Sequence, residues 1–438
     1  MTIPLPSVAE ARPIPLRAAD GRGTPAVGGR ERRLRRVMLY AHDTYGLGHL
    51  RRTLAIATHL LRTTEQLQIV LVSGSPVASR FSLPRGLSLV SLPPVVKVAP
   101  EQYASRDGRI GIGVLSRARA AIIADVARRF EPDVLLVDHA PQGMRGELLP
   151  TFEMLRERLP GTRIVLGLRD VLDEPQAVRE TWAAQGVIDT LEQVYDRILV
   201  YGSRDVLDVG SAYGIPARLR SRITYCGYVA RTPEPAAAGP APDAELPRRP
   251  YILGTAGGGE DGMPVLHATL AAAGELALDA LIVTGPLMSA AARDELAAAA
   301  SAVRGARVVD FVPDLPAVMG RAAAMVTMGG YNTMCEAVGA GVPTVVVPRT
   351  WPRREQAIRA GLFADRGLVR VVDPGEDLDR RLADRLREAL ADPSRPRARI
   401  DLDGASRVRD ALVEAVAEPR LDDEWAFAAS AVREPVPA

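Results

Sequence analysis

The sequence alternates between short apolar runs and stretches in which apolar residues recur every three or four positions. The first apolar run covers residues 37–41, and Leu50, Leu54, Ala57 and Leu60 follow it at helical spacing. A short apolar run predicts a buried strand, whereas the longer spacing predicts an amphipathic helix. Strands that alternate with helices are typical of a parallel sheet covered by helices. The chain is therefore predicted to be an α/β protein.

Further apolar runs divide into two groups. In the first part of the chain, strands are predicted at 68–73, 87–92, 134–138, 163–168, 197–201 and 223–227. In the second part, strands are predicted at 251–255, 281–284, 308–311, 325–328, 344–347 and 369–372. Because each part repeats the same strand–helix alternation, the sequence predicts two Rossmann-like domains that face each other across a cleft.

Proline and alanine are concentrated in residues 231–250, whose sequence is RTPEPAAAGPAPDAELPRRP. Proline lacks a backbone donor and resists both helices and central strands, so this segment is predicted to be a linker. It separates a first domain, residues 34–230, from a second domain, residues 251–416. Residues 1–33 are predicted to be a disordered leader. Residues 417–438 are predicted to form a last helix that packs back on the first domain, and then a tail.

The composition excludes several classes of function. The 438 residues are 47% hydrophobic and 25% charged, as in soluble proteins of two or more domains. A formal net charge of +2 gives no bulk attraction to nucleic acid or to membranes. No apolar run reaches the roughly 18 residues of a transmembrane helix, and Cys226 and Cys335 form neither a disulfide framework nor a zinc site. We expect a cytoplasmic protein, with at most peripheral association at the inner face of the membrane.

Three glycine-rich turns follow predicted strands, at 45–48, 254–262 and 328–330. Such a turn before a helix exposes backbone N–H groups that can bind phosphate. The first turn begins like a dinucleotide-binding fingerprint but has Arg51 at the third glycine position, which disfavours NAD binding. The second turn lacks the Gly-Lys-Ser/Thr of a P-loop. A binding loop and a flexible surface loop are both open interpretations of the second turn.

The residues after the third turn also have two interpretations. Glu336 lies one turn into a predicted helix, where its carboxylate can face the cleft. It also stands three residues after Thr333, in the spacing of a capping box, which would make it structural. The amides at the start of this helix suit a diphosphate in either case. Downstream, Glu355 and Gln356 follow a polar loop and can hydrogen-bond to sugar hydroxyls.

Polar residues at the ends of two first-domain strands form a candidate acceptor side. Asp138 and His139 end the strand predicted at 134–138, and Arg169 ends the next strand. Ligands of open α/β sheets bind at the carboxyl ends of strands. His49 opens the first helix, where a neutral imidazole can take a proton from a hydroxyl. The alternative for His49 is a polar residue that only closes a loop.

No metal site is predicted. Two Asp-x-Asp triplets occur at 377–379 and 401–403, and paired carboxylates of this kind can hold a divalent ion on phosphates. Both triplets lie in charged stretches beside helices, far in sequence from the glycine turns. We interpret them as helix caps and solvated surface. No cluster of histidine and cysteine indicates zinc, and no cofactor is expected.

The order of the motifs between residues 254 and 368 resembles that of the family 28 glycosyltransferases, which have the two-domain GT-B fold and include the peptidoglycan N-acetylglucosaminyl transferase. The resemblance implies that the second domain binds a nucleotide-diphosphate sugar, with UDP as the expected nucleotide. It also implies that the glycine turns approach the diphosphate, that Glu336 binds the ribose and that the strand end at 311–312 meets the base. The implied donor-binding residues are Gly257, Gly258, Gly259, Phe311, Val312, Gly329, Gly330, Asn332, Thr333, Glu336, Glu355 and Gln356.

The predicted reaction is an inverting, metal-independent transfer of the sugar to an acceptor hydroxyl. His49 is the predicted general base, with Asp138 or His139 as alternatives. The acceptor, whether a small molecule, a lipid-linked molecule or a glycan, is expected on the first domain. The predicted acceptor-side residues are Gly46, Gly48, Arg51, Asp138, His139 and Arg169. Two other functions stay open, namely a non-hydrolysing nucleotide-sugar epimerase and a catalytically silent nucleotide-sugar-binding protein.

Overall fold

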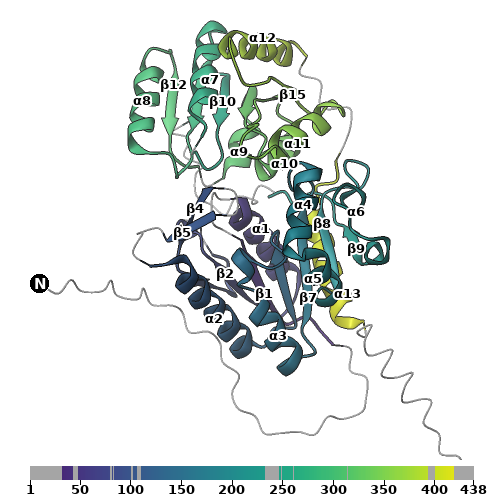
Figure 1. The fold of residues 1–438 in the computed structure, drawn as a ribbon. Coiled ribbons are helices and arrows are strands. Elements are labelled where there is room, and N and C mark those ends of the chain that lie inside the picture. The colour runs from purple at the N-terminus through teal and green to yellow at the C-terminus, as the bar shows by residue number, and fades with distance from the viewer. Residues whose placement is uncertain are drawn as a thin grey trace, which may run out of the picture.

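The computed structural model describes residues 32–42, 48–78, 81, 83–99, 102–105, 110–231, 246–247, 249–259, 261–312, 314–392 and 400–418. They form two α/β domains, each with a parallel sheet between helices, and the second domain stands on the first (Figure 1). The predicted α/β class and the two Rossmann-like domains are therefore confirmed. No helix in the described part of the chain is long and apolar enough to span a membrane.

The first domain has a seven-stranded sheet within the described residues. Its strands, in sheet order, are β3 (Leu87–Ser91), β2 (Gln68–Ser73), β1 (Arg36–Ala41), β6 (Val134–Asp138), β7 (Arg163–Arg169), β8 (Arg197–Tyr201) and β9 (Ile223–Tyr225). β1 pairs in parallel with β2 on one side and with β6 on the other, so the winding of the chain reverses between β1 and β6. Ligands of open parallel sheets bind at the carboxyl ends of the strands beside such a reversal.

Helices cover both faces of this sheet (Figure 1). They are α1 (Gly48–Thr63), α2 (Ile112–Phe130), α3 (Leu149–Arg158), α4 (Pro175–Gln185), α5 (Val187–Val194) and α6 (Val209–Ala212), with short 3₁₀ turns at Met144–Gly146 and Ala217–Arg222. α1 buries Leu50, Leu54, Ala57 and Leu60, which are the residues whose spacing predicts the helix. A separate antiparallel hairpin of β4 (Val95–Ala99) and β5 (Gln102–Ser105) is absent from the strands predicted by sequence.

The second domain repeats this plan with a sheet that has six strands in the described residues. Its strands, in sheet order, are β12 (Ala306–Val309), β11 (Asp279–Val283), β10 (Tyr251–Thr255), β13 (Ala324–Thr327), β14 (Thr344–Val346) and β15 (Arg370–Val371). Its helices are α7 (Met263–Glu275), α8 (Ala290–Ser301), α9 (Leu315–Met319), α10 (Tyr331–Ala340), α11 (Glu355–Ala364) and α12 (Leu378–Ala391). The winding reverses between β10 and β13, where two of the glycine turns begin.

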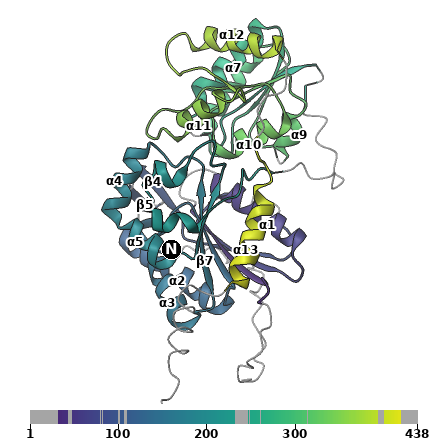
Figure 2. The ribbon, with the colours of Figure 1, turned by 90° about the vertical axis from the view of Figure 1, so that its right-hand side faces the viewer.

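The last helix, α13 (Gly404–Ala417), returns to the first domain and lies against α1 and β8 (Figure 2). Arg163 of β7 anchors it by donating from Nε to the carbonyl oxygen of Ala415 at 2.8 Å. The sequence places residues up to 416 in the second domain, and the structure corrects this boundary to a point before Gly404. The predicted leader before residue 32, most of the predicted linker and the tail after residue 418 lie outside the described residues.

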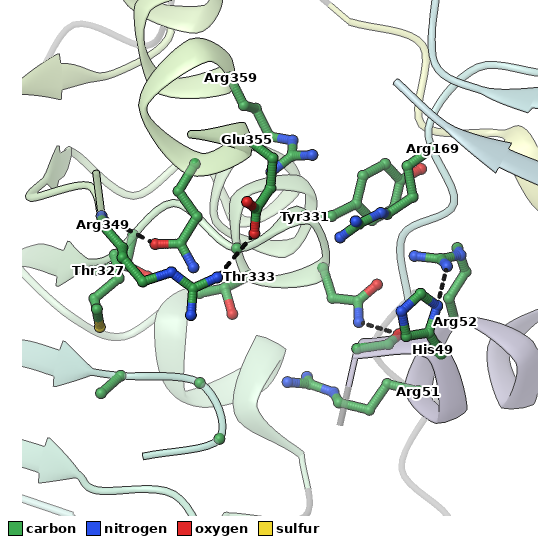
Figure 3. A pocket seen from close by; sticks show the side chains of 18 of the residues that line it. His49, Arg51, Arg52, Arg169, Thr327, Tyr331, Thr333, Arg349, Glu355 and Arg359 are labelled. Carbon is green, nitrogen blue, oxygen red and sulfur yellow. Dashed lines mark hydrogen bonds and ion pairs between the residues drawn. The ribbon is translucent and has the colours of Figure 1, made fainter. Parts of the chain in front are cut away.

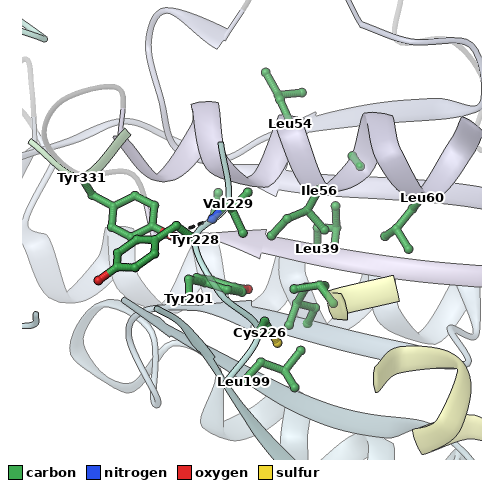
Figure 4. Close-up of a cluster of buried hydrophobic side chains, with 14 of the residues drawn as sticks. Leu39, Leu54, Ile56, Leu60, Leu199, Tyr201, Cys226, Tyr228, Val229 and Tyr331 are labelled. Carbon is green, nitrogen blue, oxygen red and sulfur yellow. Dashed lines mark hydrogen bonds between the residues drawn. The ribbon is translucent and has the colours of Figure 1, made fainter. Parts of the chain in front are cut away.

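The apolar core of the first domain continues into the second. One cluster of buried side chains joins Leu39 and Leu199 of the first sheet to Tyr331 of α10 and to Phe363 of α11 (Figure 4). The ring of Tyr228 stacks on that of Tyr331, with centroids 6.0 Å apart. Because separating these surfaces would expose apolar area to water, the cluster holds the domains together beneath the cleft.

Candidate active site

A cavity of about 190 Å³ lies between the two domains, where both windings reverse (Figure 3). The first domain lines it with Gly48, His49, Arg51, Arg52 and Arg169. The second domain lines it with Ala256, Gly257, Gly258, Gly259, Asp261, Thr327, Met328, Gly330, Tyr331, Asn332, Thr333, Arg349, Glu355, Gln356 and Arg359. Most of the residues predicted from the sequence for the donor and the acceptor are thus brought together in one place.

His49 and Asp138 form a dyad on the first-domain wall. His49 opens α1 after β1, and Asp138 ends the adjacent strand β6. The Nδ1 atom of His49 lies 2.6 Å from Oδ2 of Asp138. An ionised carboxylate only accepts hydrogen bonds, so Nδ1 carries the proton and Nε2 keeps a lone pair. His49 is therefore held in the tautomer that can accept a proton at Nε2.

Arg52 fixes the carboxylate of this dyad. Its Nη2 atom donates to Oδ1 and Oδ2 of Asp138 at 2.8 and 2.7 Å, and its Nε donates to Oδ1 at 3.0 Å. Nη2 also lies 3.1 Å from Nδ1 of His49, but two donors face each other there, so this contact is no hydrogen bond in the assigned tautomer. Both Arg52 and Asp138 are almost fully buried, at 1% and 4% exposed side chain.

The electrostatics keep His49 neutral and Asp138 charged near neutral pH. Burial lowers the pKa of His49 to about 4, although Asp138 favours its protonated form. Burial also opposes the charge of Asp138, but Arg52 and His49 outweigh it and hold the pKa of that carboxyl at about 2. A carboxyl with so low a pKa is a weak base. The geometry therefore favours His49 over Asp138 as the proton acceptor.

His139 lies beside the dyad rather than in it. Its ring centroid is 4.9 Å from that of His49, and its backbone has a φ of 70°. Burial lowers the pKa of His139 well below its usual value, so this ring is also neutral. It is not one of the residues that line the cavity. His139 is thus placed further from an acceptor hydroxyl than His49.

Part of the second-domain wall is built from glycine-rich backbone. The turn after β10 passes through Gly259 with a φ of 101°, where a Cβ would lie 2.3 Å from the carbonyl oxygen of Thr284. Gly329 has a φ of 83° and leads to Gly330, where a Cβ would meet nothing within 4 Å. α10 begins directly after Gly330, and the first amides of a helix have no partner inside it. The first amides of α10 therefore lie at the cavity, as anion sites require. In the turn after β10, the N–H groups of Gly257 and Gly259 donate to Thr255 and Ala256.

Glu336 has a partner that the sequence did not indicate. The cap of α10 is Gly330, so Thr333 is the third residue of the helix and the capping-box interpretation is wrong. The carboxylate of Glu336 instead accepts from Nη2 of Arg51 at 2.8 and 2.7 Å, and its side chain is 1% exposed. Arg51 of the first domain thus covers the carboxylate that the family resemblance assigns to ribose.

Asn332 makes a second link between the domains at this point. Its Nδ2 atom donates to the carbonyl oxygen of Gly48 at 2.8 Å. Thr333 lines the cavity and is mostly buried. The starts of α1 and α10 are therefore in direct contact across the cleft, and a donor that enters here meets both domains.

Arg349 arranges the predicted sugar-binding residues. Its Nη2 atom donates to Oε1 of Glu355 at 2.9 Å, and its backbone N–H donates to Oε1 of Gln356 at 3.1 Å. The second carboxylate oxygen of Glu355 is buried without a partner. Burial opposes the charge of Glu355, but Arg169 and Arg349 lower its pKa, so it is ionised. The free oxygen can accept a hydrogen bond from a hydroxyl.

Some predicted site residues lie outside the cavity. Phe311 follows β12 and packs edge-on against Phe81 of the first domain, with ring centroids 5.9 Å apart. Val312 packs into an apolar core cluster. Neither these residues nor Gly329, Glu336, Asp138 or His139 line the cavity. Gly46 lies outside the described residues.

The described residues contain no group of three or more His, Cys, Asp or Glu that could hold a metal ion. In the first Asp-x-Asp triplet, Asp377 is the N-cap residue of α12, but its side chain makes no capping hydrogen bond. In the second triplet, Asp401 pairs with Arg407. Both triplets thus lie beside helices, as predicted, although the metal independence of the reaction stays a prediction.

Two arginines that sequence reasoning missed organise the site. Arg359 of α11 donates from Nε and Nη2 to Asp170 at 2.9–3.1 Å, across the domain boundary, and both side chains are at most 2% exposed. Arg52 has the role described above. A charged residue on the buried face of a predicted helix, as Arg52 is on α1, was the available signal. Arg359 carries the same signal, because it lies on the buried face of α11 beside Ala360 and Phe363.

Comparison with known proteins finds a family that resembles part of the chain. Residues 269–414 match the model of the glycosyltransferase family 28 C-terminal domain. This part of the chain is therefore similar to the family 28 glycosyltransferases. No curated protein matches the chain at a significant level. The predicted resemblance and the glycosyltransferase class are thereby confirmed.

Solved structures of low sequence identity share the fold of this chain over most of its length. MurG of Acinetobacter baumannii is 15% identical, covers 87% of this chain and 99% of its own, and has a TM-score of 0.53. The spinosyn forosaminyltransferase SpnP is 16% identical, covers 92% and 100%, and has a TM-score of 0.56. A putative UDP-N-acetylglucosamine 2-epimerase from Listeria monocytogenes is 15% identical, covers 86% and 95%, and has a TM-score of 0.57. The predicted GT-B fold is confirmed.

Proposed function

We propose that this protein transfers a sugar from a nucleotide-diphosphate donor, with UDP as the nucleotide, to a hydroxyl of an acceptor bound on the first domain. The observation that carries the proposal is the 2.6 Å contact of His49 with Asp138 in a cavity whose opposite wall bears two glycine turns and a helix start. One wall offers a proton acceptor, and the other offers donors for a diphosphate. Glycosyl transfer requires both.

In the proposed reaction, Nε2 of His49 takes the proton of the acceptor hydroxyl as its oxygen attacks the anomeric carbon. The bond between that carbon and the diphosphate oxygen breaks, and its electron pair leaves with the nucleoside diphosphate. Asp138 stabilises the imidazolium that forms, and Arg52 keeps Asp138 in position. A single displacement of this kind inverts the configuration of the sugar. A general base contributes about a hundred- to ten-thousand-fold to such a rate.

Backbone amides take the place of a metal in this proposal. The N-terminus of α10 and the turn at Gly257–Gly259 line the cavity, and a helix N-terminus presents N–H groups and carries a partial positive charge. Preorganised donors of this kind stabilise charge as it develops, without reorganisation during the reaction. Negative charge on the departing diphosphate is therefore stabilised in the absence of a divalent ion.

Glu336 is 1% exposed beneath Arg51 and does not line the cavity, so binding of ribose by Glu336 requires that Arg51 move aside. The cavity of about 190 Å³ is also smaller than the roughly 300–1,000 Å³ of usual ligand sites. Both observations support a closed conformation that opens to admit the donor. Closure after binding would then exclude water and limit hydrolysis of the donor.

The proposal is tested with a panel of UDP-, dTDP- and GDP-sugars, each incubated with and without pools of small-molecule, lipid-linked and glycan acceptors. We expect release of UDP that depends on an acceptor, together with a glycosylated product of inverted configuration. Conversion of the donor to an epimer without acceptor would support the epimerase instead. Binding of donors without turnover in any pool would leave a silent binding protein.

A further inference from the structure

Arg169 differs from the other arginines of the cavity because its guanidinium has no partner. It ends β7, lines the cavity and points toward Tyr331 (Figure 3). Among the described residues no hydrogen bond or ion pair reaches this side chain, and its Nε atom is buried without a partner. The other arginines of the cavity pair with carboxylates: Arg51 with Glu336, Arg52 with Asp138, Arg349 with Glu355, and Arg359 with Asp170.

An unpaired cation in such a place is unfavourable by itself. Burial lowers the pKa of Arg169 to about 10, against the attraction of Glu355 and together with repulsion from Arg359 and Arg52. The group is still charged at neutral pH. The side chain is half-buried, and a partly desolvated charge without a partner gains free energy when an anion binds beside it. The guanidinium of Arg169 is therefore a cation in the cavity that a bound anion can pair with.

The groups on the second-domain wall indicate which part of a ligand would supply this anion. The start of α10 faces the same cavity with the amides of its first turn, so two anion-attracting features, this helix start and Arg169, converge there. The second oxygen of Glu355 is buried without a partner in the same cavity and accepts a hydroxyl. Phosphate beside hydroxyl groups is the chemistry of a nucleotide sugar at the junction of its diphosphate and its sugar.

We propose that Arg169 binds the donor's diphosphate from the first domain, opposite the start of α10, and stabilises the leaving group. This inference rests on the proposed function. As the bond between the anomeric carbon and the diphosphate breaks, its electron pair passes to the phosphate oxygen, and Arg169 donates hydrogen bonds to that phosphate. The acceptor proton passes to His49. The guanidinium fork suits two phosphate oxygens at once, which a lysine does not.

The test compares UDP with uridine, which lacks the diphosphate, by titration calorimetry on the full chain. Arg169→Gln should weaken UDP binding by about ten- to a hundredfold and leave uridine binding unchanged, since charge-assisted hydrogen bonds contribute to affinity in that range. Arg169→Lys should bind UDP more tightly than Arg169→Gln does and less tightly than the unmodified protein does. The control is Arg204→Gln, which removes the same charge from an exposed arginine after β8 that pairs with Asp208. It should bind UDP as the unmodified protein does.

The other possible results also support or overturn the proposed role of Arg169. If folded Arg169→Gln binds UDP normally, the inference is overturned, and a simultaneous rise in the acceptor Michaelis constant would assign Arg169 to an anionic acceptor. If the unmodified protein binds neither UDP nor uridine, the proposed nucleotide fails, and a titration with inorganic pyrophosphate decides the anion site separately. Pyrophosphate binding that Arg169→Gln abolishes would support the site. No pyrophosphate binding by the unmodified protein would overturn it.

Discussion

The two walls of the cleft present different kinds of groups. The first-domain wall consists of side chains that ionise or carry charge, with His49, Asp138 and Arg52 held in one network. The second-domain wall adds glycine-rich backbone, in the turns after β10 and β13, to side chains such as Arg349 and Glu355, which pair with each other. Proton transfer needs a group whose protonation changes, which backbone cannot supply, whereas a diphosphate needs several donors in fixed positions. The comparison therefore assigns the chemistry to one wall and most of the donor binding to the other.

The largest effect is expected from His49→Ala. The turnover number should fall about a hundred- to ten-thousand-fold because the proton acceptor is lost, while the dissociation constant for UDP stays nearly unchanged. Steady-state kinetics and calorimetry measure the two quantities. His59→Ala, which changes a histidine further along α1 away from the cavity, is the matched control. Normal turnover with weak UDP binding would show that His49 binds the donor and is not the general base. That result would contradict the division of roles between the two walls.

Glu336→Gln should weaken donor binding by the second domain. We expect the donor Michaelis constant to rise about tenfold, because an amide accepts from ribose hydroxyls less strongly than a carboxylate does, and the turnover number to change little. Stability should also fall, since the buried bridge to Arg51 is weakened. Kinetics with varied donor and thermal melting measure both. If only stability changes, Glu336 is an interdomain bridge and not a ribose ligand.

The pH dependence should be small between pH 6 and pH 8. The pKa of His49 is about 4, below the usual 6.5, so the ring stays unprotonated throughout this range. We expect kcat/KM to change by less than about twofold there and to fall only as the pH drops through about 4. Because the folded protein disfavours the protonated ring, stability should also decline as the pH falls from about 6.5 toward 4. An acid limb centred near 6.5 in a protein that is still folded would show that the imidazole is not buried as described.

Removal of divalent metal ions with a chelator should leave the turnover number unchanged, which is the smallest effect expected here. If backbone donors and Arg169 stabilise the diphosphate, excess EDTA leaves the turnover number unchanged. The assay is the release of UDP before and after dialysis against the chelator. Loss of activity that magnesium or manganese restores would contradict the backbone account of the second wall.

The strands and glycine turns were predictable because their causes are local. β2 and β6 have the boundaries that their apolar runs predict, since a strand buried on both faces needs an unbroken run. Gly259 and Gly329 mark real turns because their backbone conformations favour glycine. The hairpin of β4 and β5 was missed because it is short and proline residues flank it, so its pattern is that of a loop.

Contacts between distant residues were not predictable in the same way. Glu336 stands 285 residues from Arg51, and Asp170 stands 189 residues from Arg359. Spacing within a helix carries no information about such partners, which is why Thr333 and Glu336 suggested a capping box. The packing of α13 on the first domain was not predictable for the same reason. Its buried residues, such as Val408 and Leu412, would suit a helix on either domain.

Hydrogen–deuterium exchange of the backbone amides, with and without UDP, tests the division between the walls most directly. The amides proposed to hold the diphosphate lie in Gly257–Gly259 and at the start of α10, in the second domain. We predict that UDP slows exchange in these two segments and leaves β6 and the residues after it, from Val134 to Gly146, nearly unchanged. Protection confined to the first-domain segment, or no protection in the glycine turns at saturating UDP, would contradict the account.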